Sequence, residues 1–388
     1  MLLIRPKFVA LDSSHLGAIA DDKASKDGAR LQRAAAFEKS FEESGGVLLL
    51  CWHHFEELLS HGNDDVVARR VTYLQSLPLV AAIASFRKED IIGSVIDQQA
   101  FEVATAFEKP LADAAMVRDE AAKSMFRLTN GADLVRPFLE SWSAIRAHFI
   151  NDEERPSEIM AISKSDFAGN DDTKIADLLK GKRRSPEDIQ RQLDLLQSRL
   201  AAEIRERGDE RITDPELSSQ EFMQEVRRHV GVIGTDNPGQ QILELFGIDV
   251  SEIYPDTTVA DVGNMSNFRK RMATVNQKLR FSLPEVIARV HDDRLPSGVI
   301  ANAIAQFHPD TRRWDGSELA DRYLACLSAY ADVTYVDKRT YEAFRIARQK
   351  SKTFASLARD IEKAGSYSDI AEQLSSHVRK PPMGAVLP

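Results

Sequence analysis

The chain has 388 residues, of which 43% are hydrophobic and 29% charged, so it is long enough for more than one compact unit. Its formal net charge of −9 argues against a protein that simply coats nucleic acid, because neutralising phosphates requires an excess of Lys and Arg. The sequence has no apolar run long enough to cross a membrane, and its two cysteines predict no disulfide framework, so we expect a cytoplasmic protein without membrane contact.

The N-terminal part alternates short apolar runs with segments of helical spacing. The expected strands are 8–11, 47–51 and 78–86, and the expected helices are 28–44, a segment that begins at Trp52, and 65–76. Strands that alternate with helices favour a parallel sheet whose two faces are covered by helices. We therefore predict an α/β fold for this part of the chain.

Expected helices dominate the middle of the chain, from about residue 88 to residue 315. They are 95–126, 132–150, 173–180, 186–207, 216–231, 237–246, 266–280, 283–292 and 296–306. We interpret 88–315 as a large helical insertion domain between the two halves of the α/β core, 1–87 and 316–365. The insertion is also where we expect contact with a protein partner or a second copy of the chain.

The α/β pattern returns after the insertion. Residues 317–330 have the spacing of an amphipathic helix, and 332–336 is a short strand that ends at Asp337. Further helices are expected at 340–349, 353–364 and 367–375, so that 366–388 would be a C-terminal helix and a loose tail.

Acidic residues occupy similar places in these segments. Asp12 and Asp337 each follow a strand, Glu56 and Glu57 lie on the helix directly after the second strand, and Asp321 lies in the helix before the later strand. Because the carboxyl ends of parallel strands meet at one edge of a sheet, we expect these side chains to converge. Converging carboxylates repel one another unless cations neutralise them, and hard oxygen ligands suit Mg²⁺ or Mn²⁺.

A simpler interpretation exists for each acid taken alone. An Asp after a strand is often only a helix cap or a turn former, and a Glu on a helix is often only solvated. The prediction of a site therefore depends on the ordered set. His53 and His54 do not form the H-E-x-x-H pattern of zinc proteases, and we expect them to be packing or surface residues.

Three stretches of the chain resemble the PIN domain: VALDSSHL at 9–16, VLLLCWHHFEELL at 47–59 and LADRYLACLSAYADVTYVDKRTYEAF at 319–344. The resemblance implies a Mg²⁺- or Mn²⁺-dependent nuclease, commonly a ribonuclease, with strand order 3-2-1-4-5. It implies catalytic roles for Asp12, Glu57, Asp321 and Asp337, with the three aspartates as metal ligands. Glu57 is preferred to Glu56 because of its E-L-L context.

The resemblance gives further residues a part in binding substrate. Ser14 matches a small hydroxyl residue that is frequent two positions after the first Asp, and Lys338, Arg339 and Arg345 would contact phosphates beside the metal. The chain departs from the pattern at Tyr335, where Thr or Ser is usual, in the large insertion, and in lacking a recognisable fifth strand.

The leading hypothesis is a metal-dependent endonuclease that hydrolyses phosphodiester bonds in RNA, or secondly DNA, with a bacterial toxin or defence effector as its role. The alternative from another class is a non-catalytic nucleic-acid-binding or scaffold protein on a PIN-like core. A metal-dependent phosphatase acting on small molecules is the third hypothesis. It would require a closed pocket, whereas a nuclease would have an open basic groove.

Overall fold

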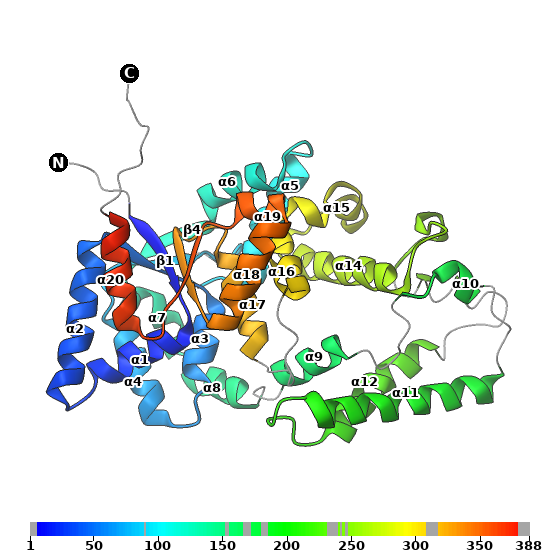
Figure 1. Cartoon of the computed structure of the whole chain (residues 1–388), viewed down its shortest axis with the longest axis horizontal. Helices are drawn as coiled ribbons and strands as arrows, with labels where there is room; N and C mark the ends of the chain where they lie inside the picture. The colour runs from blue at the N-terminus through cyan, green and yellow to red at the C-terminus, as the bar shows by residue number, and fades with distance from the viewer. Residues whose placement is uncertain are drawn as a thin grey trace. The chain divides into compact units, whose positions relative to one another are not determined.

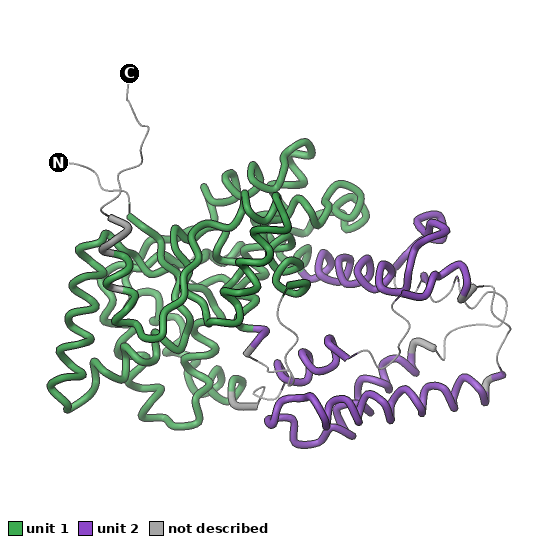
Figure 2. Tube along the Cα trace, in the orientation of Figure 1, with its two compact units in different colours: residues 1–151, 275–310, 320–388 green, residues 152–274, 311–319 purple. Residues whose placement is uncertain are grey.

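The computed structural model describes residues 6–88, 91–151, 155–165, 172–179, 185–230, 240, 243–244, 247–307 and 317–378. The chain forms two compact units, coloured separately in Figure 2. Unit 1 consists of residues 1–151, 275–310 and 320–388, and unit 2 consists of residues 152–274 and 311–319. The fold class is α/β, as predicted, because unit 1 is built on a mostly parallel sheet flanked by helices.

The sheet of unit 1 has six strands in the order β4-β3-β2-β1-β5-β6. They are β1 (Lys7–Leu11), β2 (Gly46–Leu50), β3 (Val80–Ile83), β4 (Phe126–Thr129), β5 (Val333–Val336) and β6 (Asp360–Lys363). Every neighbouring pair is parallel except β3 and β4, which are antiparallel. The chain therefore joins strands that are far apart in the sequence, and β1 lies in the interior of the sheet.

Helices cover both faces of this sheet (Figure 1). One face packs against α1 (Ser13–Lys23), α2 (Gly28–Glu43), α3 (Trp52–Leu59), α4 (Asp64–Gln75), α7 (Gly131–Leu139), α8 (Trp142–Asn151) and α20 (Tyr367–Val378). The other packs against α5 (Val95–Glu108), α6 (Ala114–Met125), α16 (Pro296–Phe307), α17 (Ser317–Leu327), α18 (Lys338–Lys350) and α19 (Lys352–Leu357). In Figure 1, α2 and α20 lie on one side of the sheet and the orange α17–α19 on the other.

Side chains alternate between these two cores along each strand, as a pleated backbone requires. In β1, Val9 and Leu11 belong to the first core and Ala10 to the second. All three are at most 1% exposed, which explains why the strand is a continuous apolar run in the sequence.

Three expected helices are divided differently in the structure. The predicted helix 132–150 is two helices, α7 and α8, with residues 140–141 between them. The predicted helix 95–126 is two helices, α5 and α6, separated around Pro110, whose ring lacks a backbone donor and disfavours a continuous helix. The predicted helix 353–364 was wrong in its second half, which is strand β6. Only Ile361 of β6 is buried, so this edge strand has no apolar alternation that would identify it.

The division into units also differs from the expected boundaries. Strand β4 and helices α5–α8 lie in unit 1, although they fall within the 88–315 region interpreted as an insertion. Residues 275–310 return to unit 1 as well, and they include α15 (Leu283–Arg289) and α16. Helix α20 is part of the first core rather than a separate element, and residues 379–388 of the expected tail lie outside the described residues.

Unit 2 is helical where it is described. It contains α9 (Arg155–Lys164), α10 (Ile175–Leu179), α11 (Pro186–Arg207), α12 (Pro215–Val230) and most of α14 (Val259–Leu279). Ser185 caps α11 and Pro186 opens it, as the sequence predicts. A small core joins α9, α11 and α12 through Ala161, Leu200 and Phe222. The expected helix 237–246 lies partly outside the described residues.

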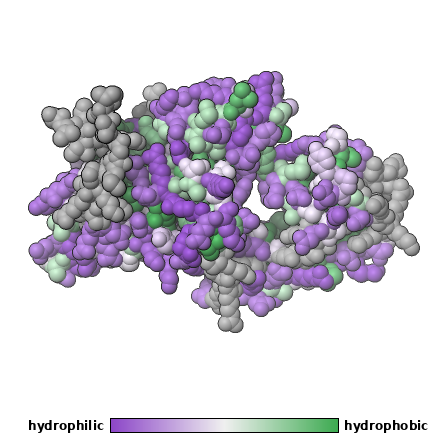
Figure 3. All heavy atoms as spheres, turned by 45° about the horizontal axis from the view of Figure 1, so that its top comes forward, coloured by the Kyte–Doolittle hydropathy of each residue, from purple (hydrophilic) through white to green (hydrophobic). Residues whose placement is uncertain are grey.

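The described helices include none with the length and apolar character that crossing a membrane requires. The face drawn in Figure 3 is mostly hydrophilic, with apolar residues in small scattered groups. Both cysteines are free and buried.

Candidate acidic site at the carboxyl edge of the sheet

Asp12 and Asp337 leave the sheet at the same edge. Strands β1 and β5 are parallel neighbours with Leu11 opposite Tyr335, so the residues that follow emerge side by side. The Asp12 N–H donates to the Tyr335 carbonyl at 3.2 Å. Each aspartate then caps a helix: Asp12 accepts from the backbone N–H of Ser14 at 2.7 Å at the start of α1, and Asp337 caps α18.

Glu57 approaches the same edge from α3, the helix after β2. Its carboxylate accepts a hydrogen bond from the Ser13 hydroxyl at 2.7 Å, and Ser13 is the residue directly after Asp12. Burial, together with the charges of Asp12 and Glu56, raises the pKa of Glu57 to about 7, although the Ser13 hydrogen bond acts in the opposite direction. Glu57 is thus joined to the end of β1 both by a hydrogen bond and by electrostatic interaction.

Asp321 brings the fourth carboxylate from α17. Burial raises its pKa to about 8, and the charges of Asp337, Asp12 and Glu57 contribute in that order, while Arg339 opposes them. The structure therefore places Asp321 within electrostatic reach of all three other predicted acids. These four carboxylates, contributed by α1, α3, α17 and α18 or their caps, are called the acidic site below.

Asp337 is held in its charged form by its neighbours. Burial acts to raise its pKa, but hydrogen bonding from Thr340 and the charge of Arg339 outweigh it, and the net pKa is lowered. The Thr340 N–H donates to Asp337 at 2.6 Å, and Arg339 Nε lies 3.4 Å from Asp337 Oδ2. Asp337 and Asp321 are thus neighbouring carboxyls with pKa values shifted in opposite directions.

The predicted substrate-binding residues are distributed unevenly. Arg339 lies in the site through Asp337, and Lys338 is an exposed residue in the first turn of α18. Arg345 is two turns further along α18, 52% exposed and paired with Glu342 at 2.7 Å. Ser14 is exposed, and the hydroxyl that contacts Glu57 belongs to its neighbour Ser13, which sequence reasoning missed.

The composition of the acidic site fits a divalent cation of the hard type. Two of its carboxyls, Glu57 and Asp321, have pKa values near or above neutrality because burial and like charge disfavour their ionised forms. A divalent cation would relieve both effects, and carboxylate oxygens are the ligands that Mg²⁺ and Mn²⁺ prefer. No three of these carboxylates bring oxygens within 4.8 Å of one another in the described part of the chain, so a shared ion requires side-chain rotation.

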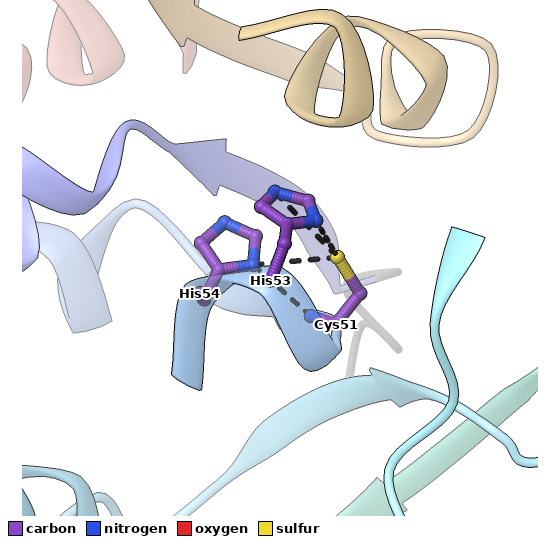
Figure 4. Close-up of side chains that lie close together, drawn as sticks. All are labelled: Cys51, His53 and His54. Atoms are coloured by element: carbon purple, nitrogen blue, oxygen red, sulfur yellow. Dashed lines mark hydrogen bonds between the residues drawn. The ribbon is translucent and has the colours of Figure 1, made fainter. Parts of the chain in front are cut away.

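A second group of potential ligands lies beside the site, where β2 ends and α3 begins (Figure 4). Cys51, His53 and His54 are buried, and their ligand atoms lie within 4.8 Å of one another. Cys51 Sγ is 2.6 Å from His53 Nδ1 and 3.5 Å from His54 Nδ1, and the two imidazole rings stack at 4.4 Å. The sequence interpretation left these histidines as packing or surface residues, and both are buried.

The hydrogen bonds of His54 indicate that the group of Cys51, His53 and His54 has a structural role. The Cys51 N–H donates to His54 Nδ1 at 3.1 Å, so the ring proton is on Nε2, which donates to the Leu11 carbonyl at 3.1 Å. Burial lowers the pKa of His54 to about 4, which keeps the ring neutral. His54 therefore ties the start of α3 to the end of β1, one residue before Asp12. A soft ion would have to displace the Cys51 N–H from His54 Nδ1.

Tyr335, which replaces the usual Thr or Ser before the last aspartate, is fully buried and packs in the first core. It is therefore not exposed for stacking on a base.

Comparison with protein-family models, with curated proteins and with solved structures gave no match.

Proposed function

We propose that this chain is a metal-dependent nuclease of the PIN-like type, which hydrolyses phosphodiester bonds, with RNA as the first substrate to test and DNA as the second. The observation that carries the proposal is the acidic site. Asp321 is buried enough, and close enough to three other carboxylates, that its pKa is raised to about 8. A purely structural protein gains nothing from such repulsion, whereas a cation-binding site requires it.

The sheet order supports the same proposal. When the antiparallel edge strand β4 is set aside, the remaining order is β3-β2-β1-β5-β6. Numbered in chain order, this is 3-2-1-4-5, the order that the resemblance to PIN domains implies. In that numbering β6 would correspond to the fifth strand, which the sequence did not reveal.

Helix capping is the simplest competing explanation, and it accounts for half of the acidic site. Asp12 and Asp337 each cap a helix, as Asp often does after a strand. Capping does not explain Asp321, which lies within α17, or Glu57, which lies within α3. It also gives no reason for the four to be within electrostatic reach of one another.

The proposed chemistry divides the residues by role. Asp12, Asp321 and Asp337 would hold one or two Mg²⁺ or Mn²⁺ ions, and a bound ion of this kind activates water and stabilises charge on a phosphoryl group. Glu57, with a pKa of about 7, can accept or return a proton at neutral pH. Arg339, which is paired with Asp337, and its neighbour Lys338 would contact the phosphate next to the scissile bond.

The test uses Asp12→Asn and Asp337→Asn, because Asn caps helices as well as Asp does and should leave the fold intact. Asp27→Asn is the matched control: Asp27 caps α2 in the same way, and its carboxylate accepts from the Ala29 N–H at 2.9 Å. With labelled RNA and DNA in Mg²⁺ or Mn²⁺, we expect both site variants to lose about 100-fold or more of the cleavage rate. The control should cut like the wild type.

Equal cleavage by wild type, Asp12→Asn and Asp337→Asn would show that the acidic site is not the catalytic one. Calorimetric titration with Mn²⁺ distinguishes the nuclease from the alternative, a non-catalytic binding or scaffold protein. Stoichiometric binding without cleavage of any nucleic acid would favour a non-catalytic binding protein, and no binding would favour a scaffold.

A further inference from the structure

A buried imidazole at the start of α3 lacks the hydrogen bonds that its two nitrogens require. His53 is 5% exposed, and among the described residues its only polar partner is the Cys51 sulfur, 2.6 Å from Nδ1 and 3.7 Å from Nε2. A neutral imidazole has one nitrogen that donates and one that accepts, whereas a thiol is weak in both roles. Buried polar side chains usually have a full partner, so His53 is an exception that needs a physical reason.

The structural role of His54 does not explain His53. His54 is hydrogen-bonded through both nitrogens, to the Cys51 N–H and to the Leu11 carbonyl. His53 stacks on His54 at 4.4 Å and lies 5.9 Å from the Tyr323 ring, and an apolar ring would make these contacts equally well. Packing therefore gives no reason for an imidazole at this position, whereas a ligand that takes its lone pair does.

The geometry of the group fits one kind of ligand. Both rings face the Cys51 sulfur (Figure 4), and the ligand atoms of the three residues lie within 4.8 Å of one another. In a tetrahedral zinc site, bonds of about 2.3 Å to sulfur and about 2.0–2.1 Å to nitrogen separate those two atoms by about 3.6 Å. His54 Nδ1 at 3.5 Å and His53 Nε2 at 3.7 Å from Cys51 Sγ match this separation.

The surroundings also favour a bound cation. Burial lowers the pKa of both histidines and keeps their rings neutral, the form that binds metals. His54 Nε2 donates to the Leu11 carbonyl at 3.1 Å, and metal-binding histidines usually donate their second ring N–H to a carbonyl or carboxylate in this way. Burial raises the pKa of the Cys51 thiol, and the charges of Cys326 and Glu57 add to the rise, so Glu57 is near enough to balance added positive charge.

We propose that Cys51, His53 and His54 bind a zinc ion, which fixes the first turn of α3 at the end of β2. Binding releases the thiol proton to solvent, forms one Zn–S and two Zn–N bonds, and leaves one position of the tetrahedron for water. The Cys51 N–H loses His54 Nδ1 as its acceptor, but one hydrogen bond contributes far less than the coordination of zinc.

This zinc site differs in chemistry from the acidic site. Thiolate and imidazole ligands favour zinc, whereas a set of carboxylates favours Mg²⁺ or Mn²⁺. The two sites should therefore take different ions from the same solution. The inference does not depend on the proposed nuclease function.

The experiment uses Co²⁺ as the probe, because it occupies zinc sites and absorbs in the near ultraviolet when it is bound to a thiolate. The full chain is kept reduced with a phosphine, freed of metal with a chelator and titrated with Co²⁺. We expect a charge-transfer band that saturates at one ion per chain and that an equal amount of Zn²⁺ abolishes. Co²⁺ at the acidic site gives no such band, since no sulfur lies among its four carboxylates.

The two cysteines of the chain provide a matched pair of variants. Cys51→Ala should remove the band, and Cys326→Ala, which changes the other buried cysteine, should keep it. Asp321→Asn should also keep it, because that variant changes only the acidic site.

His53→Phe tests the imidazole while keeping a ring against His54 and Tyr323. We expect it to weaken Zn²⁺ binding at least about 100-fold, because loss of even an outer partner of a metal ligand typically costs about 10–100-fold. Zn²⁺ should raise the melting temperature of the wild type but not that of His53→Phe or Cys51→Ala. Circular dichroism in the chelator checks that each variant is folded.

The proposal is overturned if the wild type gives no charge-transfer band, or if the band survives in Cys51→Ala and depends on Cys326 instead. It is also overturned if Zn²⁺ binding survives Cys51→Ala and His53→Phe but is lost in Asp321→Asn, which would assign the ion to the acidic site. These measurements involve no nucleic acid, so their outcome is independent of the test of the nuclease proposal.

Discussion

Among the regions of unit 1 that remove a carboxyl group from solvent, two do so in opposite ways. In the first, Glu102 of α5 is 0% exposed and is surrounded by hydrogen-bond donors. Its oxygens accept from the Ser297 N–H at 3.0 Å and hydroxyl at 2.6 Å, from Gln98 Nε2 at 3.1 Å, and from the Tyr330 hydroxyl at 2.8 Å. Burial raises the pKa of Glu102, and these hydrogen bonds act against that effect.

The second region is the acidic site. Asp321 has no hydrogen-bond donor among the described residues, and its neighbours include three other carboxylates with Arg339 as the opposing charge. Glu102 is fully buried and Asp321 is partly buried, so both are removed from most of the solvent, and burial alone does not explain the difference. The surrounding groups do, because a carboxylate that accepts several hydrogen bonds is stabilised within the core, whereas one surrounded by like charge would be stabilised by a cation.

The largest expected effect on stability follows from removing the Glu102 carboxylate, whose hydrogen bonds are all made within the core. Glu102→Ala leaves the hydroxyls of Ser297 and Tyr330 and the Gln98 amide without their buried acceptor. We expect it to lower the free energy of unfolding by about 3–5 kcal/mol, measured by urea denaturation. Glu108→Ala, at an exposed position of the same helix, should change it by less than about 0.5 kcal/mol. A small effect of Glu102→Ala would show that the hydrogen bonds of Glu102 contribute little to the stability of the core.

Asp321→Asn should change the free energy of unfolding in the opposite direction and stabilise the fold. In a chelator at pH 8, removing its charge relieves repulsion by Asp337, Asp12 and Glu57 and should stabilise the fold by about 1–2 kcal/mol. This is less than the pKa shift alone suggests, because the side chain is partly exposed and salt screens its charge. With Mn²⁺ present, the wild type should become the more stable of the two. If Asp321→Asn instead destabilised the fold in the chelator, the Asp321 carboxylate would be a stabilising part of the core, as that of Glu102 is.

The pH dependence of stability sharpens the comparison further. Glu57 and Asp321 have folded-state pKa values of about 7 and 8, above their unfolded values, so each stabilises the fold while protonated and loses that contribution as pH rises through the folded pKa. His15, His53 and His54 have folded-state pKa values lowered by burial, so they bind protons mainly in the unfolded state, and their deprotonation there raises stability until about one pH unit above the unfolded pKa of 6.5. Above that pH only the two carboxyl groups contribute, so in a chelator the melting temperature should fall from about pH 7.5 to 8.5.

Mn²⁺ should remove that fall, since the ionised carboxylates then gain a cation, and Asp321→Asn should reduce it in the chelator. A melting temperature that is flat over this range in the chelator would contradict the assignment of both raised pKa values.

The smallest effect is expected at Ser13. Ser13→Ala removes the hydrogen bond that favours the charged form of Glu57, so the pKa of Glu57 should rise and the lower limb of the cleavage pH profile should move upward by less than about one unit. Ser14→Ala is the control and should leave the profile unchanged, because only the backbone of Ser14 contacts Asp12. A shift in Ser14→Ala but not in Ser13→Ala would support the sequence-based prediction that Ser14 is the functional hydroxyl.

The sequence was informative where local chemistry decides the structure. Apolar runs located β1, β2 and β5, and the acids that follow them are at the sheet edge because parallel strands all end there. The choice of Glu57 over Glu56 stays a prediction, although the Ser13 hydrogen bond supports it.

Other features depend on tertiary contacts that no local pattern encodes. Strands β4 (FRLT) and β6 (DIEK) are short edge strands with only one fully buried residue between them, so they lack the apolar spacing by which strands are recognised. The contact between Ser13 and Glu57 depends on the register between α1 and α3, and the bond from His54 to Leu11 depends on the packing of α3 against β1. Neither could be deduced from spacing along the chain.

The pairing of β1 with β5 determines when the acidic site can exist. The Phe8 N–H donates to Asp332 across 324 residues of sequence, so the central strand receives its second neighbour only after most of the polypeptide has left the ribosome. Until then, Asp12 and Glu57 lack Asp321 and Asp337. A nascent polypeptide that ends before Asp321 therefore holds only two of the four carboxylates, so the acidic site is complete only when synthesis is nearly finished.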